Sequence, residues 1–334
     1  MKYNKLRVLG KGTYGIVYLI IDKNTNKKYS LKKMLYNKEM IKSCQNELKI
    51  LKLVKSDYII NIKNYFIRNG NFNIIMEYAS QGDLSNYIKQ NKNRFSIIKP
   101  NDIKKIILSI TEGLKALHKL DIIHRDIKPS NILICENFNI KLTDFGISKI
   151  VDNKYAVFTK IGTPYYMSPE MLNGKKYSFP IDYWSLGCIL YELLTFKKPF
   201  ESNSLHGLYT KITKGTYNTY NLNYKYKKLI VGLLQKNPSF RFGYIQIVKH
   251  FDDLDKNKII INKNNIIENK KKFYSNLYDK YKYTPKYQKY YKPVKQIKKN
   301  NKIYNKPIQN KIKKNYLPKI NYHKKLHKKK YLIH

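Results

Sequence analysis

The sequence predicts an α+β protein with two lobes, a small antiparallel β lobe that contains one helix and a larger, mainly helical lobe. Three short β-type runs separated by glycine and polar turns fill the first 35 residues. Apolar residues recur at helical spacing in 101–119, and a strongly apolar segment at 180–195 suits a buried helix. After about residue 251 no sustained periodicity remains, so the folded part is expected to end there.

The first lobe is predicted to contain four strands and one helix. The strands are expected at Leu6–Leu9, Ile16–Ile21, Tyr29–Met34 and Phe72–Met76. From Lys38 to Val54 the apolar positions recur at helical spacing, which predicts the helix between the third and fourth strands.

The second lobe is predicted from two helical segments and two short strands. Asn101–Lys119 is amphipathic, and its first or second residue is expected to cap the helix. Short strands are expected at Ile132–Ile134 and Ile140–Leu142. Residues 180–195 form a strongly apolar segment that begins with proline, which is typical of a buried helix.

The composition argues against a membrane-spanning or a secreted protein. The chain has 334 residues, and no apolar stretch approaches the roughly 20 residues of a membrane span. The first residues, MKYNKLRVLG, contain no signal-peptide core. We therefore expect an intracellular protein, cytoplasmic, nuclear or both. Cys44, Cys135 and Cys188 are widely spaced and form no metal-binding pattern, so free thiols are expected.

The positive charge is concentrated toward the end of the chain. Residues 1–250 hold 42 Lys and Arg against 17 acids, whereas residues 251–334 hold 25 lysines against 5 acids. We interpret 1–252 as one folded domain, with lobes at about 1–78 and 81–252. Residues 253–334 are interpreted as a mostly disordered lysine- and tyrosine-rich tail. However, Lys, Asn, Ile and Tyr are abundant throughout, so compositional bias explains the charge equally well.

A glycine-rich motif of the form GxGxxGxV lies between the first two predicted strands. Glycines permit a tight turn and let backbone amides approach phosphate oxygens, and Val17 would cover an adenine ring. A chance glycine-rich hairpin or a dinucleotide site would give a similar pattern. A dinucleotide site requires a helix after the glycines, and here a strand is predicted. The motif comprises Gly10, Lys11, Gly12, Thr13, Tyr14, Gly15, Ile16 and Val17.

Lys32 in the third strand is a candidate phosphate ligand. Its ammonium can reach nucleotide phosphates if an acidic partner holds it, and Glu47 on the following helix is the best candidate. Lys33 with Glu39 is the fallback pair. It ranks lower because an alternating strand points Lys33 to the opposite face and Glu39 lies at or before the helix start.

The motif His124–Asn131, HRDIKPSN, followed by Asp144–Gly146, DFG, carries the strongest signal. Here the sequence closely resembles the protein kinase superfamily. Lysine two residues after the motif's aspartate is typical of serine/threonine kinases. The resemblance therefore implies a bilobal protein kinase fold and an enzyme that uses ATP and Mg²⁺ to phosphorylate serine or threonine hydroxyls of protein substrates.

The same resemblance assigns the catalytic roles. It implies that Asp126 orients the substrate hydroxyl and accepts its proton, and that Lys128 neutralises the transferring phosphoryl group. It also implies that Asn131 and Asp144 hold the magnesium ions. Such a set is needed because the charge of the phosphoryl group redistributes during transfer, so catalysis is mainly positioning and electrostatic stabilisation.

The resemblance also outlines the nucleotide site, with a hinge at residues 77–80 behind a gatekeeper methionine. Ser30 stands where an alanine is usual above adenine, and it adds a hydroxyl to an apolar roof. The residues implied to surround ATP are Gly10, Lys11, Gly12, Thr13, Tyr14, Gly15, Val17, Ser30, Lys32, Glu47, Met76, Glu77, Ala79 and Asp83.

Downstream residues are implied to be scaffolding. Glu170, which ends the string GTPYYMSPE, would form a buried ion pair with Arg241. Asp182 would tether the catalytic-loop backbone, and Thr163 would contact Asp126 and Lys128. GTPYYMSPE, with WSLGC at residues 184–188, is most similar to the NIMA-related (NEK) kinases.

Two regions carry regulatory or binding hypotheses. Thr159 is expected to be an activating phosphosite, modified by an upstream kinase or by the enzyme itself, with Arg125 binding its phosphate. As an alternative function, residues 251–334 are a candidate polyanion-binding arm for nucleic acid, microtubules or acidic membrane, and their last part, 270–334, contains 22 lysines and one acid. The lysines of 323–330 are a candidate nuclear import signal.

Overall fold

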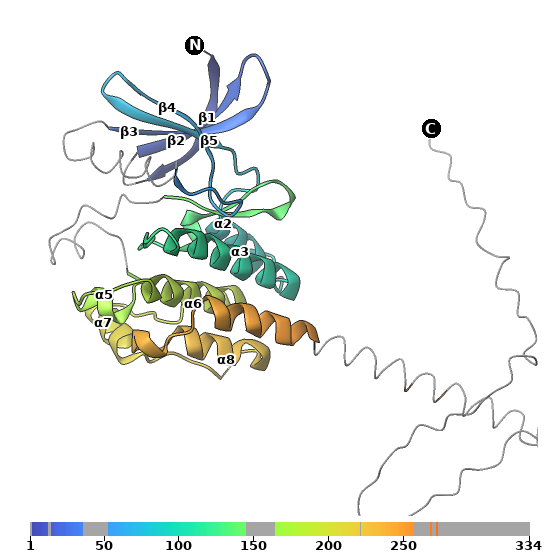
Figure 1. Ribbon diagram of the computed structural model, residues 1–334, viewed down its shortest axis with the longest axis vertical. Coiled ribbons are helices and arrows are strands. Elements are labelled where there is room, and N and C mark those ends of the chain that lie inside the picture. The colour runs from blue at the N-terminus through green and yellow to red at the C-terminus, as the bar shows by residue number, and fades with distance from the viewer. Residues whose placement is uncertain are drawn as a thin grey trace, which may run out of the picture. The chain divides into compact units, whose positions relative to one another are not determined.

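The computed structural model of the protein describes residues 2–12, 15–35, 53–144, 164–220 and 222–256, together with Glu268 and Lys272. In the first of two compact units, Met1–Asn265, a five-stranded antiparallel sheet precedes a lobe built mainly of helices (Figure 1). The predicted α+β fold class with two lobes is confirmed.

The first lobe is a sheet with the strand order β1-β2-β3-β5-β4. Each of the four predicted strands is present and extends further at both ends. The predicted helix between the third and fourth of these strands lies mostly outside the described residues. The strands are β1 (Tyr3–Gly12), β2 (Gly15–Asp22), β3 (Lys28–Leu35), β4 (Ile62–Arg68) and β5 (Asn71–Glu77).

Strand β4 is the element of this sheet that the sequence analysis missed. It lies at the edge of the sheet, and six of its seven residues are exposed, so its apolar residues do not alternate with polar ones. The signal that could have found it is the dipeptide Asn69-Gly70. Both residues have positive φ, 48° and 63°, which matches the two-residue turn that joins hairpin strands.

The described part of the second lobe is mainly helical, with a short two-stranded sheet and three 3-10 turns. The two short strands and the buried helix at 180–195 agree with the prediction residue for residue. The elements are α2 (Leu84–Asn93), α3 (Pro100–His118), η1 (Pro129–Asn131), β6 (Ile132–Ile134), η2 (Glu136–Phe138), β7 (Ile140–Leu142), α5 (Pro169–Leu172), α6 (Pro180–Thr195), α7 (Leu205–Lys214), α8 (Tyr224–Leu233) and η4 (Pro238–Phe240).

Helix α3 begins one residue earlier than predicted. Pro100 is its first helical residue, and Lys99 with extended backbone precedes it, so the predicted cap at Asn101 or Asp102 is wrong. Proline suits the first position of a helix because its missing N–H would have no partner there and its φ is already helical.

The core of the second lobe is centred on α6. Twelve of its sixteen residues are buried, and Trp184 stacks on Phe200 with ring centroids 5.4 Å apart. A Cβ atom at Gly187 would lie 2.8 Å from the Cβ of Leu233, so α6 and α8 approach too closely for a side chain there.

Residues 244–256 form a helix that is fastened to α3. The Tyr244 hydroxyl donates to Glu112 (2.6 Å) and accepts from Lys115 (2.6 Å), and Asp255 pairs with Lys104. The helix therefore continues beyond the predicted domain limit at residue 252. Among the described residues, no helix has the length and apolar character needed to cross a membrane.

Candidate active site

The segment between α3 and β6 is held in place by a buried carboxylate on α6. Asp182 accepts from the backbone N–H groups of His124 (3.0 Å) and Arg125 (2.9 Å), and its side chain is 1% exposed. The predicted tether of this backbone by Asp182 is confirmed. His118 at the end of α3 also contacts Asp182, at 2.9 Å, and sequence reasoning missed this contact.

The imidazole of His124 links the segment to the strand that precedes Asp144. Burial lowers the pKa of His124, so the ring is neutral and has one N–H donor. Its Nε2 lies 3.1 Å from the Thr143 carbonyl, and the N–H of Asp126 points at Nδ1 from 3.4 Å. The Nε2–H tautomer satisfies both contacts. Arg125 and Asp144 keep positive φ angles of 71° and 65°, so these contacts stabilise unfavourable backbone conformations.

Asp126, Lys128 and Asn131 form one cluster. Lys128 Nζ lies 2.8 Å from Asp126 Oδ2, and the Asn131 amide donates to the same oxygen, also at 2.8 Å. A second bond from the Asn131 amide to the Asp126 carbonyl fixes the loop (2.8 Å). Within the described residues, both side-chain contacts fall on Oδ2, which leaves Oδ1 able to accept a proton or a hydroxyl donor. The carboxylate is about one-third exposed.

Lys32 and Asp144 form an ion pair between the two lobes. Lys32 lies on β3 with 8% of its side chain exposed, and Asp144 follows β7. Burial opposes ionisation of Asp144, but the Lys32 ammonium outweighs it and holds the pKa of Asp144 below its ordinary value. The structure thus brings Lys32 rather than Lys33 to the site. The predicted partner Glu47 lies outside the described residues.

The donor set of Asn131 and Asp144 fits a magnesium ion. Asp144 is ionised, and the Asn131 amide nitrogen is engaged by Asp126, so its carbonyl oxygen is the group left to face a cation. Carboxylate and amide oxygens are the ligands that Mg²⁺ prefers. The N–H of Thr143 donates to the main-chain carbonyl of Asn131 (3.1 Å), and this bond links the backbone at Asn131 to the residue before Asp144.

The hydroxyl of Ser30 is satisfied by the hinge. Ser30 is 7% exposed, and its Oγ donates to the carbonyl of Glu77 at 3.0 Å, with the Met76 carbonyl at 3.5 Å. The Glu77 carboxylate accepts from Asn61 N–H (2.9 Å) and pairs with Lys141 (2.7 Å). Because Lys141 lies on β7, this pair connects the two lobes at the hinge, a contact the sequence did not reveal.

The glycine motif joins β1 and β2 as a hairpin. Gly10 pairs with Val17, and Gly12 pairs with Gly15. Gly15 has φ 151°, and a Cβ there would lie 2.1 Å from a backbone oxygen of β3, so only glycine fits. Since a strand follows the glycines, the dinucleotide alternative is excluded.

Several other predicted site residues are placed individually. Asp83 caps α2 by accepting from the Asn86 N–H (2.8 Å), and the Ala79 carbonyl accepts from Gly82 (3.3 Å). Met76 is 5% exposed at the end of β5. The predicted site residues that lie outside the described ranges are Thr13, Tyr14, Glu39, Glu47, Thr159 and Thr163.

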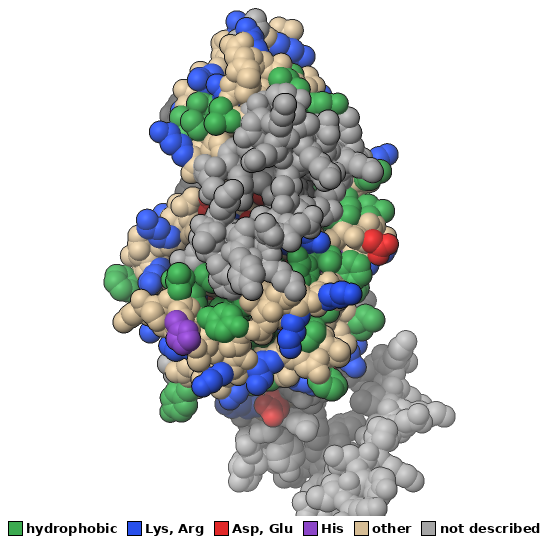
Figure 2. Space-filling model, turned by 90° about the vertical axis from the view of Figure 1, so that its left-hand side faces the viewer, with side chains coloured by type: hydrophobic (Ala, Val, Ile, Leu, Met, Phe, Trp, Pro, Cys, Tyr) green, Lys and Arg blue, Asp and Glu red, His purple; other side chains and the backbone are tan. Residues whose placement is uncertain are grey.

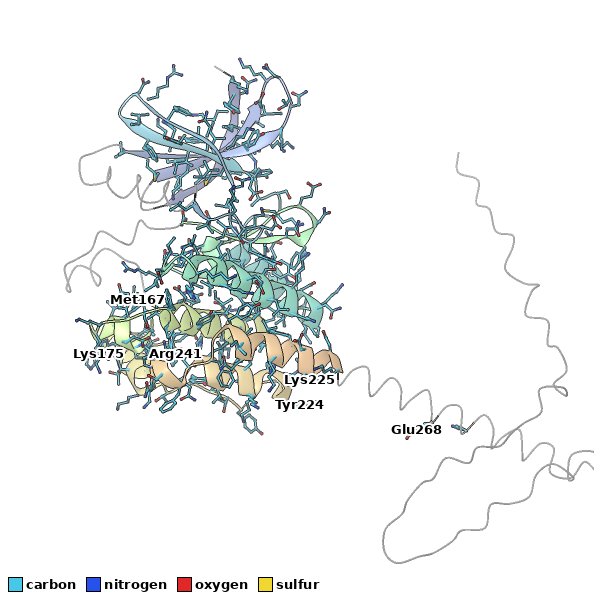
Figure 3. All side chains as sticks on the ribbon, viewed as in Figure 1. Met167, Lys175, Tyr224, Lys225, Arg241 and Glu268 are labelled. Carbon is cyan, nitrogen blue, oxygen red and sulfur yellow. The ribbon has the colours of Figure 1, made fainter. Side chains whose placement is uncertain are left out.

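The predicted ion pair between Glu170 and Arg241 is confirmed. Two parallel bonds join them, at 2.6 and 3.0 Å, and both side chains are buried. Arg241 also donates to the carbonyls of Pro180 and Gln235, each at 3.0 Å, and lies over the ring of Trp184. In Figure 3, Arg241 and Met167 are both labelled in the left part of the helical lobe.

Arg125 has a neighbour that the sequence did not suggest. Its guanidinium carbon lies 5.4 Å from the ring centroid of Tyr177, in the link between α5 and α6. Its Nε is buried and has no hydrogen-bond partner within the described part of the chain.

Comparisons with known proteins agree with this geometry. The sequence profile of the family described as "Protein kinase domain" matches residues 3–251. The chain is 35% identical to the mouse serine/threonine-protein kinase Nek3 over 242 residues, which are 72% of this chain and 47% of that protein. It is 39% identical to a probable serine/threonine-protein kinase nek2 of Dictyostelium discoideum over 225 residues, 65% of this chain and 54% of that protein.

A third relative is human serine/threonine-protein kinase Nek5, 36% identical over 255 residues, which are 74% of this chain and 36% of that protein. The chain thus spans about half or less of the length of these relatives. Their names confirm the resemblance to NIMA-related kinases that the sequence predicted. On the match over residues 3–251, with the fold and the site geometry, the chain belongs to the protein kinase family.

Proposed function

We propose that the protein is a serine/threonine kinase that transfers the γ-phosphoryl group of ATP to hydroxyls of protein substrates. The observation that carries the proposal is the cluster in which Lys128 and Asn131 both contact one oxygen of Asp126 at 2.8 Å. This arrangement fixes the rotamer of Asp126 and leaves its other oxygen for the substrate hydroxyl.

The chain's own residues divide the work of phosphoryl transfer. Asp126 Oδ1 orients the acceptor hydroxyl and takes its proton. Lys128, already 2.8 Å from Asp126, neutralises charge on the transferring group. Lys32 binds the non-transferred phosphates, while Asn131 and Asp144 hold Mg²⁺, which supplies charge neutralisation on the nucleotide when bound.

The test is turnover of a generic protein substrate by Asp126→Asn, with Asp252→Asn as the matched control. Asp252 is exposed on the helix of residues 244–256 and is not part of the Asp126 cluster, so its substitution is expected to leave activity unchanged. Loss of the base is expected to reduce kcat on the order of 100- to 10,000-fold. Equal denaturation midpoints would show that both variants are folded. Near-wild-type turnover in Asp126→Asn would refute the assignment.

Regulation by phosphorylation belongs to the same proposal. We propose that a phosphate on Thr159, added by an upstream kinase or by the enzyme itself, binds Arg125. The buried Nε of Arg125 without a partner in the described chain supports this role. Full activity of wild-type protein after phosphatase treatment, or unchanged phosphatase sensitivity in Thr159→Ala, would rule it out.

A second function is proposed for the basic tail. With 22 lysines and one acid in residues 270–334, it would bind a polyanion such as nucleic acid or a microtubule, in a cytoplasmic or nuclear setting. The folded domain is basic as well: on the face in Figure 2, Lys and Arg side chains outnumber acidic ones. Compositional bias is therefore the competing explanation.

Truncation after Lys256 separates these two explanations. The helix of residues 244–256 is described as far as Lys256, so a chain truncated there keeps its contacts with α3. Heparin or DNA retention of the full chain is expected to fall steeply with added salt and to be largely lost on truncation. Retention that is unchanged by truncation would leave only compositional bias.

A further inference from the structure

The link between α2 and α3, residues 94–99, presents two large apolar side chains to solvent. Phe95 is 96% exposed and Ile97 is 88% exposed. Ile98, the next residue, is 2% exposed and anchors the link in the core. Two apolar side chains this exposed, with only Ser96 between them, form a protrusion rather than a groove.

The backbone under this protrusion is fixed by a helix-ending motif. The N–H of Phe95 donates to the Lys92 carbonyl (3.1 Å), and the N–H of Ser96 donates to the Asn91 carbonyl (3.0 Å). This pair of bonds is the Schellman motif, and Phe95 occupies its left-handed position with φ 52°. Glycine is usual there because a bulky side chain is disfavoured at positive φ.

The fold therefore gains nothing evident from a phenylalanine at residue 95. Its side chain buries almost no surface, and its backbone conformation favours glycine. A residue that is unfavourable on both counts is better explained by a contact made outside the chain.

The helix end and the link that carry the protrusion are basic. Residues 84–101 contain no acid, and the acids that bracket them are engaged locally: Asp83 caps α2, and Asp102 accepts from the Tyr87 hydroxyl at 3.2 Å. The cations of this stretch, all exposed, are Lys89, Lys92, Arg94 and Lys99.

We propose that residues 94–99 form a membrane-contact site that inserts Phe95 and Ile97 into the interface of a bilayer containing anionic phospholipids. An apolar tip with exposed lysine and arginine close to it along the chain matches such a surface, because the tip enters the acyl boundary while the cations meet anionic headgroups. A fluid bilayer receives a protrusion without needing a matching cavity. Burial of each side chain strengthens partitioning by roughly tenfold or more.

The experiment uses the full chain with a fluorescent reporter at the tip. The protein has one tryptophan, Trp184, which is 0% exposed and gives a constant background. Phe95→Trp is mixed with vesicles of phosphatidylserine and phosphatidylcholine whose phosphatidylcholine carries brominated acyl chains. The new tryptophan is expected to shift to shorter wavelength and to be quenched. The matched control is Tyr220→Trp, at a residue 90% exposed between α7 and α8, which is expected to stay unquenched.

This readout separates the tip from the basic tail. The tail can hold the chain on anionic vesicles, but only insertion brings residue 95 within reach of the bromine atoms. Vesicles of phosphatidylcholine alone are expected to give much weaker quenching, because they lack the anionic headgroups. Equal quenching of the two reporters, or none at Phe95→Trp while the chain sediments with the vesicles, would overturn the proposal and leave a protein partner as the explanation of the protrusion.

A second variant separates binding from stability. Phe95→Gly with Ile97→Ser is expected to weaken vesicle binding at high salt by at least about tenfold. Because glycine suits the left-handed position, the denaturation midpoint of Phe95→Gly is expected to equal or exceed that of wild type. A clear fall in that midpoint would show that Phe95 serves the fold, and unchanged binding of the double variant would refute the site.

Discussion

The buried pair of Glu170 and Arg241 allows a sharp test of the energetics. In Arg241→Met, the Glu170 carboxylate stays buried without the two bonds of 2.6 and 3.0 Å that satisfy it. Removing one partner of a buried pair costs about 3–5 kcal/mol. For a domain of this size that corresponds to a fall in Tm of roughly 6–20 °C. Glu170→Gln is expected to cost less, about 1–3 kcal/mol, because Arg241 keeps its bonds to the Pro180 and Gln235 carbonyls.

The assay is urea denaturation of wild type, both single variants and the double variant, followed by circular dichroism. The double variant is expected to be more stable than the sum of the single effects predicts, by about 1–3 kcal/mol, since it leaves neither charge unpaired. If all three variants unfold within about 1 kcal/mol of wild type, the pair does not support the helical lobe as argued.

Three further predictions follow from the site. Ser30→Ala is expected to lower KM for ATP a few-fold, because it frees the Glu77 carbonyl from the bond at 3.0 Å; a raised KM would contradict this. The pKa of Asp144 is lowered from 3.8 by Lys32, so the stability gap between wild type and Asp144→Asn should hold at neutral pH and close as the pH falls below about 4. A gap that is the same at every pH in urea titrations would refute it. Asp182→Asn should reduce kcat more than it raises KM, since it loosens the Asp126 segment rather than a binding contact; the reverse pattern in steady-state kinetics would contradict that role.

The sequence predicted the elements whose signal is local. The buried helix at 180–195 and the strands at 132–134 and 140–142 have the predicted bounds. In each case an apolar run between turn residues marks where the element begins and ends. Strand β4 was missed because its side chains face solvent and carry no alternation. The start of α3 was misplaced because the polar residues that follow proline suggested a cap, whereas proline itself opens the helix.

The site shows the same division between local and long-range information. The motif around Asp126 and the pairs made by Asp182 and Glu170 could be predicted because the family resemblance links distant positions. The contacts of His118 with Asp182 and of Lys141 with Glu77 could not, since each joins ordinary polar residues from separate elements. The hydroxyl of Ser30 was expected in an apolar roof, and it instead bonds a carbonyl that only the folded hinge brings near.

With Lys32 binding nucleotide phosphates and Asp144 binding Mg²⁺, as proposed above, their ion pair makes the binding of the two ligands thermodynamically interdependent. Without nucleotide, Lys32 pairs with the carboxylate that would bind a cation. The Asp144 carboxylate in turn pairs with the ammonium that would bind phosphates. Whichever ligand arrives first must separate the pair, and the second then finds its partner already released. Nucleotide and divalent cation should each raise the other's affinity by the same factor, since such coupling is reciprocal. Until the first ligand arrives, the pair also keeps two opposite charges between the lobes neutralised.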